Sequence, residues 1–217
     1  MTQSLESRLI ELLNARLCHD LISPVSAVNN GIELIAEMGD DADGEALGLV
    51  ATSGKEAARK LRFFRLAFGS ARLPSGADAG LAEAREAVLD WPAGERVALS
   101  WPAAVSRALP REGVKIAMLL AMAALDCLGG AGTLTMATQP SPGGVLWSAT
   151  ARGPRAAVPA DMAAALAGQS AMEDLSPKTA PAAYAALLAM TIGTRIVGTA
   201  PNGPGEIRLE CLIPVAA

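Results

Sequence analysis

Apolar residues recur at helical spacing over the first third of the chain. From Leu5 to Ile35 most of them lie three or four positions apart, which predicts one long helix ending near Met38. The next stretch, Gly39 to Glu45, is rich in glycine and aspartate, as is typical of a turn. A second stripe then follows with alternating steps of three and four: Leu47, Val50, Gly54, Ala57, Leu61, Phe64 and Phe68.

These two stripes predict an antiparallel helical hairpin. One hairpin cannot cover two apolar stripes by itself, so we expect a second copy of the chain to complete a dimeric four-helix bundle. The segment from Gly69 to Gly80, rich in Gly, Pro and Ser, is typical of a linker. We therefore expect two domains, at residues 1–72 and 73–217.

Helical and strand patterns alternate in the second part of the chain. The sequence predicts helices near residues 79–89, 111–128, 160–168 and 180–192, and strands at 95–101, 133–138, 145–151, 195–199 and 206–214. The pair Asn202-Gly203 favours a tight turn between the last two strands. The expected fold class is therefore α+β: a helical hairpin followed by a two-layer α/β sandwich.

Composition narrows the classes of function. The 217 residues are 51% hydrophobic and 18% charged, which suits a packed core and excludes intrinsic disorder. The formal net charge of −4 argues against a nucleic-acid partner. Three scattered cysteines and one histidine match no metal-site spacing and indicate a reducing compartment. No apolar run is long enough for a membrane span and the polar start is not a signal peptide, so we expect a cytoplasmic protein without a membrane partner.

His19 is the single histidine of the chain. It lies about 200° around the helix from both Leu17 and Leu21, which predicts an imidazole off the apolar stripe. A neutral imidazole keeps a free lone pair, as a nucleophile requires. Asp20 can stand beside it as a proton acceptor or orienting carboxylate. Pro24 removes the amide that would bond the Asp20 carbonyl, and so bends the helix near the histidine.

The order His19, Asp20, Pro24 resembles the phosphoacceptor box of sensor histidine kinases. The longer segment Ala15 to Ile35 is similar to the ChpT-type histidine phosphotransferase family of alphaproteobacterial phosphorelays. The resemblance implies that His19 accepts a phosphoryl group from a receiver-domain aspartate of a hybrid histidine kinase and passes it to response-regulator receiver domains. Asp20 would stabilise or accept the proton on the other ring nitrogen. Magnesium would be carried by the receiver, so no cofactor is implied for this chain.

The resemblance also implies that the second domain is a degenerate, kinase-ATPase-like sandwich. Ala123 stands where a kinase has its magnesium-binding asparagine, and Ala151 stands where a kinase has the aspartate that binds adenine. Arg155 replaces the second glycine of that motif, and residues 176–190 contain no glycine-rich phosphate loop. We therefore expect neither ATP binding nor autokinase activity. The sequence leaves open whether such a phosphotransfer protein, with its phosphohistidine intermediate, is classed as an enzyme.

The hairpin geometry indicates a docking surface for the receiver. The residues of the second helix opposite His19 lie around Phe63, which falls off the apolar seam and is a candidate exposed anchor. Cations of the same stretch, including Arg59 and Arg62, would attract an acidic receiver, although cations near a helix C-terminus also complement its dipole. Candidates that share the face of His19 on the first helix are Arg16, Ile22, Ser23 and Ser26.

Two other functions stay open from the sequence. A non-catalytic docking or regulatory module derived from a histidine kinase would bind partners without using His19. An active kinase with divergent motifs would bind ATP. The three missing nucleotide motifs argue against the kinase, and the order of His19, Asp20 and Pro24 argues, less decisively, against the docking module.

Overall fold

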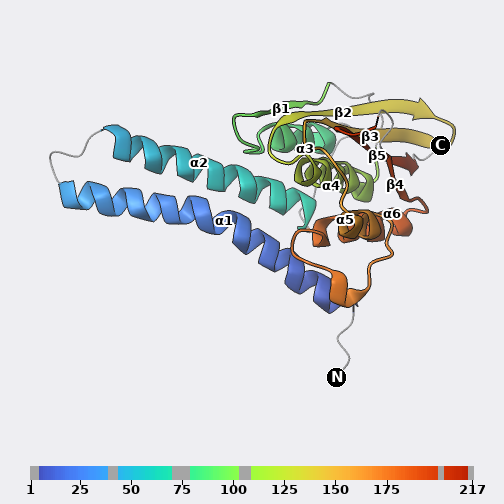
Figure 1. Ribbon diagram of the computed structural model, residues 1–217, viewed down its shortest axis with the longest axis horizontal. Coiled ribbons are helices and arrows are strands. Elements are labelled where there is room, and N and C mark those ends of the chain that lie inside the picture. Colours follow the sequence, from blue (N-terminus) through green and yellow to red (C-terminus); the bar gives the residue numbers. More distant parts are fainter. Residues whose placement is uncertain (1–4, 39–43, 70–78, 103–108, 200–202, 215–217) are drawn as a thin grey trace.

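The computed structural model describes residues 5–38, 44–69, 79–102, 109–199 and 203–214. Two long helices, α1 (Leu5–Met38) and α2 (Gly44–Ala67), form an antiparallel hairpin whose far end projects away from the rest of the molecule (Figure 1). Both helices were predicted, with nearly these bounds. Most of the predicted turn and most of the predicted linker lie outside the described residues. The predicted domain boundary between residues 72 and 73 lies outside them as well.

The rest of the described chain forms a two-layer sandwich, which confirms the predicted α+β class. Its elements in chain order are α3 (Ala79–Leu89), β1 (Val97–Ser100), α4 (Arg111–Cys127), β2 (Gly132–Ser141), β3 (Gly144–Arg152), α5 (Ala160–Leu166), the 3-10 turn η2 (Met172–Asp174), α6 (Ala180–Thr191), β4 (Ile196–Thr199) and β5 (Glu206–Pro214). The short turn η2 has no counterpart in the sequence-based expectation.

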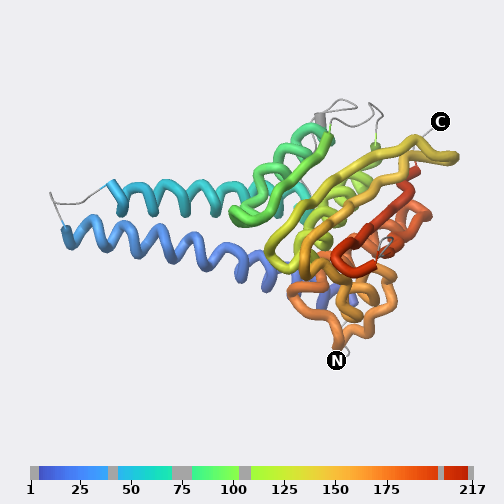
Figure 2. Tube along the Cα trace, turned by 45° about the horizontal axis from the view of Figure 1, so that its top comes forward, coloured from blue at the N-terminus to red at the C-terminus, as the bar shows by residue number. Residues whose placement is uncertain are grey.

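The five strands form one sheet in the order β1-β2-β3-β5-β4. β1 runs parallel to β2, and the other neighbouring strands are antiparallel. In this register Trp147 of β3 lies between Thr138 of β2 and Cys211 of β5. The strands form one layer and the helices the other (Figure 2).

The core lies between the sheet and α4. This helix is buried almost all round, since residues 113–124 of it are all buried, and it packs against β2, β3 and β5. The first part of α1 joins the same core through Leu9 and Leu12, which are buried near α6. The hairpin is therefore packed on the sandwich. None of the described helices is long and apolar enough to cross a membrane.

The predicted apolar seam of α2 is only partly the face that packs on α1. Leu47 and Leu61 are half-exposed in the single chain, whereas Ala46 and Ser53 are buried. The two helices come very close at Gly31 of α1, where a Cβ atom would lie 2.6 Å from Val50 Cγ2. The face toward α1 thus combines small residues with Val50, and several large apolar side chains face outward.

Candidate functional site

His19 lies on α1 with 82% of its side chain exposed, as predicted. Its Nδ1 atom is 3.1 Å from Oδ1 of Asp20, whose own side chain is largely covered. A carboxylate can only accept a hydrogen bond, so this contact places a proton on Nδ1 and, of the two neutral tautomers, selects the one protonated there. The lone pair then resides on Nε2, at the exposed side of the ring. Such an imidazole is equipped to attack an electrophile from solvent.

A second carboxylate enters this site from the sandwich. Arg16, one turn before Asp20 on α1, donates from Nε to Asp20 Oδ2 at 2.8 Å. Its two terminal nitrogens donate to both oxygens of Asp126 on α4, at 2.9 and 3.0 Å. Burial opposes the charge of Arg16, but the hydrogen bonds and charges of Asp126 and Asp20 outweigh it and raise its pKa. The guanidinium is therefore a fixed cation that joins α1 to the sandwich.

The main chain of the site is supported from α2. Lys60 donates from Nζ to the backbone carbonyl of Asp20 at 3.0 Å, and its ammonium also pairs with Glu56 at 2.7 Å. Pro24, which has no amide to offer that carbonyl, is buried at the next turn of α1. In Figure 1 α1 changes direction along its length, as expected for a helix with an internal proline.

His19 opens onto a cleft of about 370 Å³ where the hairpin meets the sandwich. The cleft is lined by Arg16, His19, Asp20, Asp126, Ser176, Pro177 and Lys178. The last three residues precede α6, at the place where a kinase would carry its glycine-rich loop. The segment before α6 runs beside α1 in both views (Figures 1 and 2). Lys178 is exposed there and adds a positive charge at the rim.

The positions that replace the kinase nucleotide motifs are occupied by core and backbone contacts. Ala123 and Ala151 are buried in the sandwich core and bring no polar side-chain atom. Downstream of β3, the amide of Ala157 donates to the carbonyl of Cys127 at 3.1 Å, and Arg155 donates to the carbonyl of Gly129. The end of β3 is thus tied directly to the end of α4.

The buried thiols of the sandwich stay protonated. Burial raises the pKa of Cys127 to about 12, with Asp126 adding to the effect. Burial likewise raises the pKa of Cys211 to about 11, against a weaker opposing effect of Thr194. Within the described ranges, no group of three His, Cys, Asp or Glu side chains is arranged to hold a metal ion. Neither thiol lines the cleft, where His19 contributes an imidazole nitrogen as a nucleophile.

Several docking candidates lie where the sequence placed them. Ile22, Ser23 and Ser26 are exposed at the helical spacing that puts them on the face of His19, and Ile22 is 67% exposed. Arg59 is exposed on α2. Arg16, by contrast, is engaged with both carboxylates of the site, so its role is internal to it.

The expectation that Phe63 is an exposed anchor is wrong. Its side chain is 2% exposed, and its ring centroid lies 4.8 Å from that of Trp91. The end of α2 packs against α3 and the turn after it, so burial there follows from contact with the sandwich and not from the hairpin seam. Arg62 is one-third exposed and pairs with Glu86 and Asp90 at 2.7 and 3.6 Å, which offsets the positive charge expected there.

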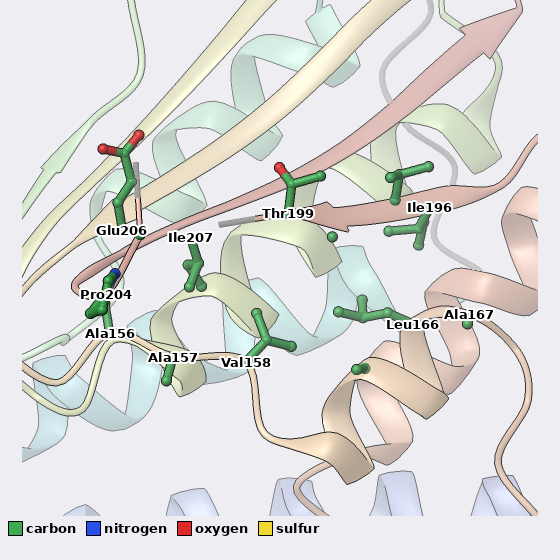
Figure 3. Close-up of a pocket in the computed structure, with 14 residues that line it drawn as sticks. Ala156, Ala157, Val158, Leu166, Ala167, Ile196, Thr199, Pro204, Glu206 and Ile207 are labelled. Atoms are coloured by element: carbon green, nitrogen blue, oxygen red, sulfur yellow. The ribbon is translucent and has the colours of Figure 1, made fainter. Parts of the chain in front are cut away.

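A larger cavity lies elsewhere, between α5, the segment after β3 and the β4–β5 end of the sheet (Figure 3). It measures about 710 Å³ and shares no lining residue with the cleft of His19. Val158, Leu166 and Ile207 point into it (Figure 3). Glu206, at its edge, is engaged with Arg152 at 3.0 Å. The described lining of this cavity is mostly apolar, and Glu206 is the one charged side chain among those lining residues.

The chain is similar in sequence and in structure to known phosphotransferases. The family model of the histidine phosphotransferase C-terminal domain matches residues 81–202. Over 185 residues the chain is 30% identical to the protein phosphotransferase ChpT of Brucella abortus (strain 2308), which covers 85% of this chain and 87% of that protein. A bacterial phosphotransferase solved at 1.7 Å matches with a TM-score of 0.78 and 27% identity, over 97% of this chain and 98% of that one.

Proposed function

Because this chain belongs to the histidine phosphotransferase family, we propose that His19 is its phosphoacceptor in a multistep phosphorelay. The observation that carries the proposal is the exposed imidazole with its Nδ1 held on Asp20. This arrangement leaves Nε2 as an unhindered nucleophile at the mouth of the cleft. The absence of a second histidine in the sequence makes the assignment unambiguous within the chain.

The transfer follows from this geometry. Nε2 of His19 attacks the phosphorus of an aspartyl phosphate in line, the new N–P bond forms, and the P–O bond to the aspartate breaks. The donor leaves as a free carboxylate. The imidazole ring becomes cationic as it is phosphorylated, and Asp20 stabilises that charge through the proton on Nδ1. The onward step to a second receiver runs along the same path in reverse.

We propose that the donor is the receiver domain of a hybrid histidine kinase and that the acceptors are response-regulator receiver domains. The receiver would bring the magnesium ion, and no nucleotide would bind to this chain. Support for the last point comes from the buried alanines at positions 123 and 151 and from the backbone hydrogen bond between Ala157, in the segment after β3, and Cys127 at the end of α4. Such a carrier would work in the cytoplasm.

We further propose that two copies of the chain form a four-helix bundle through their hairpins. Large apolar side chains remain half-exposed along the projecting hairpin: Val25, Ile32, Leu34, Leu47, Leu49 and Leu61. A second hairpin would cover them. Analytical ultracentrifugation of the native chain and of Ile32→Lys tests this proposal, with a dimer expected for the former and a shift to monomer for the latter.

Phosphoryl transfer from a purified phosphorylated receiver tests the central proposal. The native chain should acquire an acid-labile, base-stable label, whereas His19→Ala should acquire none, and ATP alone should label neither. Label on the native chain from ATP alone would instead identify a kinase. If phosphorylated receivers transfer no label to the native chain but bind the native chain and His19→Ala equally well, the chain is a docking module.

A further inference from the structure

We infer that Asp126 is a positioning residue for phosphoryl transfer: it fixes Arg16, which fixes Asp20, which sets the tautomer of His19. The inference rests on the proposed function of His19 and extends it to the sandwich. Asp126 touches no reacting atom, so it acts only through Arg16 and Asp20.

The geometry is that of a directed chain of contacts. The planar guanidinium of Arg16 presents its terminal nitrogens to Asp126 in a two-pronged pair, at 2.9 and 3.0 Å. That pairing leaves Nε as the donor directed at Asp20 Oδ2, at 2.8 Å. With Oδ2 so engaged, Oδ1 is left for the imidazole Nδ1 at 3.1 Å. Each link constrains the orientation of the next.

The charges support the same reading. Three side chains, two acids and one base, carry a combined charge of −1 and are at most 18% exposed. Without Asp126, the guanidinium of Arg16 would have Asp20 as its remaining carboxylate partner. The terminal nitrogens of Arg16 could then turn toward both carboxylate oxygens of Asp20. The imidazole would then compete with Arg16 for Oδ1. Asp126 thus reserves one oxygen of Asp20 for His19.

The position of Asp126 on its helix is a second and independent observation. It lies in the last turn of α4, where the helix dipole disfavours a negative charge, and that turn contains no basic residue. The partner that compensates this charge is Arg16, which is 110 positions away in the sequence. An acid that is placed against the local preference and paired with a residue of the site is typical of a functional constraint.

The test uses the single histidine of the chain as its own reporter. Long-range ¹H–¹⁵N correlation spectra of the imidazole report directly whether the proton resides on Nδ1 or on Nε2. Phosphoramidate serves as the phosphoryl donor because it needs no receiver docking. The variant is Asp126→Asn, which keeps the shape of the side chain and removes its charge. The matched control is Glu206→Gln, which breaks the two-pronged pair of Arg152 with Glu206, and neither of these residues lines the cleft of His19.

We expect native protein and Glu206→Gln to hold the proton on Nδ1 and to be phosphorylated at equal rates. In Asp126→Asn the proton population should shift toward Nε2, and phosphorylation should slow by about tenfold. Arg16→Lys, whose single nitrogen cannot make the two-pronged pair with Asp126 and donate from a separate atom to Asp20, should show the same shift and gives a second route if Asp126→Asn folds poorly. An unchanged tautomer and rate in folded Asp126→Asn would overturn the inference. A native protein that receivers and phosphoramidate both fail to label would instead contradict the proposed function itself.

Discussion

Lys60 on α2 donates a hydrogen bond across the hairpin to the backbone carbonyl of Asp20, at 3.0 Å. In an uninterrupted helix the amide of residue 24 would make that bond, and Pro24 has no amide. The ammonium of Lys60 thus replaces a main-chain donor one residue after His19. The bend at Pro24 is in this way stabilised from outside the helix that contains it.

Removing this donor should destabilise the protein because it leaves a carbonyl without its partner. Lys60→Met should lower the free energy of unfolding by about 1–2 kcal/mol, as measured by urea denaturation. In a Pro24→Ala background the new amide of residue 24 can donate to the Asp20 carbonyl. Lys60→Met should therefore lower the free energy of unfolding by less in that background. Equal losses in both backgrounds would show that Lys60 acts only through Glu56.

Phe63 should prove to be a core residue in solution. Phe63→Ala should lower the free energy of unfolding by roughly 3–5 kcal/mol, because it leaves a cavity beside Trp91. The measurement is again urea denaturation. The folded fraction of the variant should accept phosphate from a receiver at the same rate as the native protein.

The matched comparison is Ile22, which is exposed on the face of His19. Ile22→Ala should change the unfolding free energy by less than about 0.5 kcal/mol. It should instead raise the receiver concentration needed for half-maximal transfer. If Ile22→Ala transfers like the native protein at every receiver concentration, this face is not the docking surface.

The close approach of the two helices at Gly31 should be sensitive to a single methyl group. Alanine is normally the better helix former, but here its Cβ would collide with Val50, whose branched side chain has little freedom to move. Gly31→Ala should therefore lower the unfolding free energy by about 1–3 kcal/mol. Val50→Ala in the same chain should restore most of the loss, and a Gly31→Ala variant as stable as the native protein would show that the hairpin shifts freely.

Lys115 should give the stability of the protein a pH dependence of known sign. Burial lowers its pKa below the ordinary 10.5, nearby Arg111 adds to this, and Glu112 opposes it. The unfolded chain then holds the proton to higher pH than the folded one does. The free energy of unfolding should therefore rise as pH rises through the lowered pKa toward 10.5, and fall as pH falls through it.

Lys115→Met removes this contribution while keeping the volume of the side chain. The difference in unfolding free energy, native minus variant, should grow with pH over that window. Tyr184, whose pKa is raised by burial, is present in both proteins, so comparing them removes most of its contribution. A difference that stays constant with pH would mean that Lys115 titrates as it does in the unfolded chain.

Local patterns in the sequence were enough to predict the four described α-helices of the sandwich and both hairpin helices, but not the 3-10 turn η2, because turn residues and apolar periods mark the ends of the longer elements. They also placed His19 on an exposed face. They misplaced Phe63, because periodicity along α2 carries no information about a contact with Trp91. Asp126 and Lys60 were missed as members of the site for the same reason: both reach it across the fold. The signal that points to Asp126 is an acid in a helix end that has no compensating base.

The bond between Arg16 and Asp126 also has a consequence for how the protein is made. Asp126 is synthesised 107 residues after His19, so an emerging hairpin carries its histidine before the partner of Arg16 exists. Contacts of such long sequence separation close late in folding. With Asp126 as the positioning residue we infer it to be, full reactivity of the histidine would require a completed sandwich, and an unfinished chain would be a poor acceptor of phosphate.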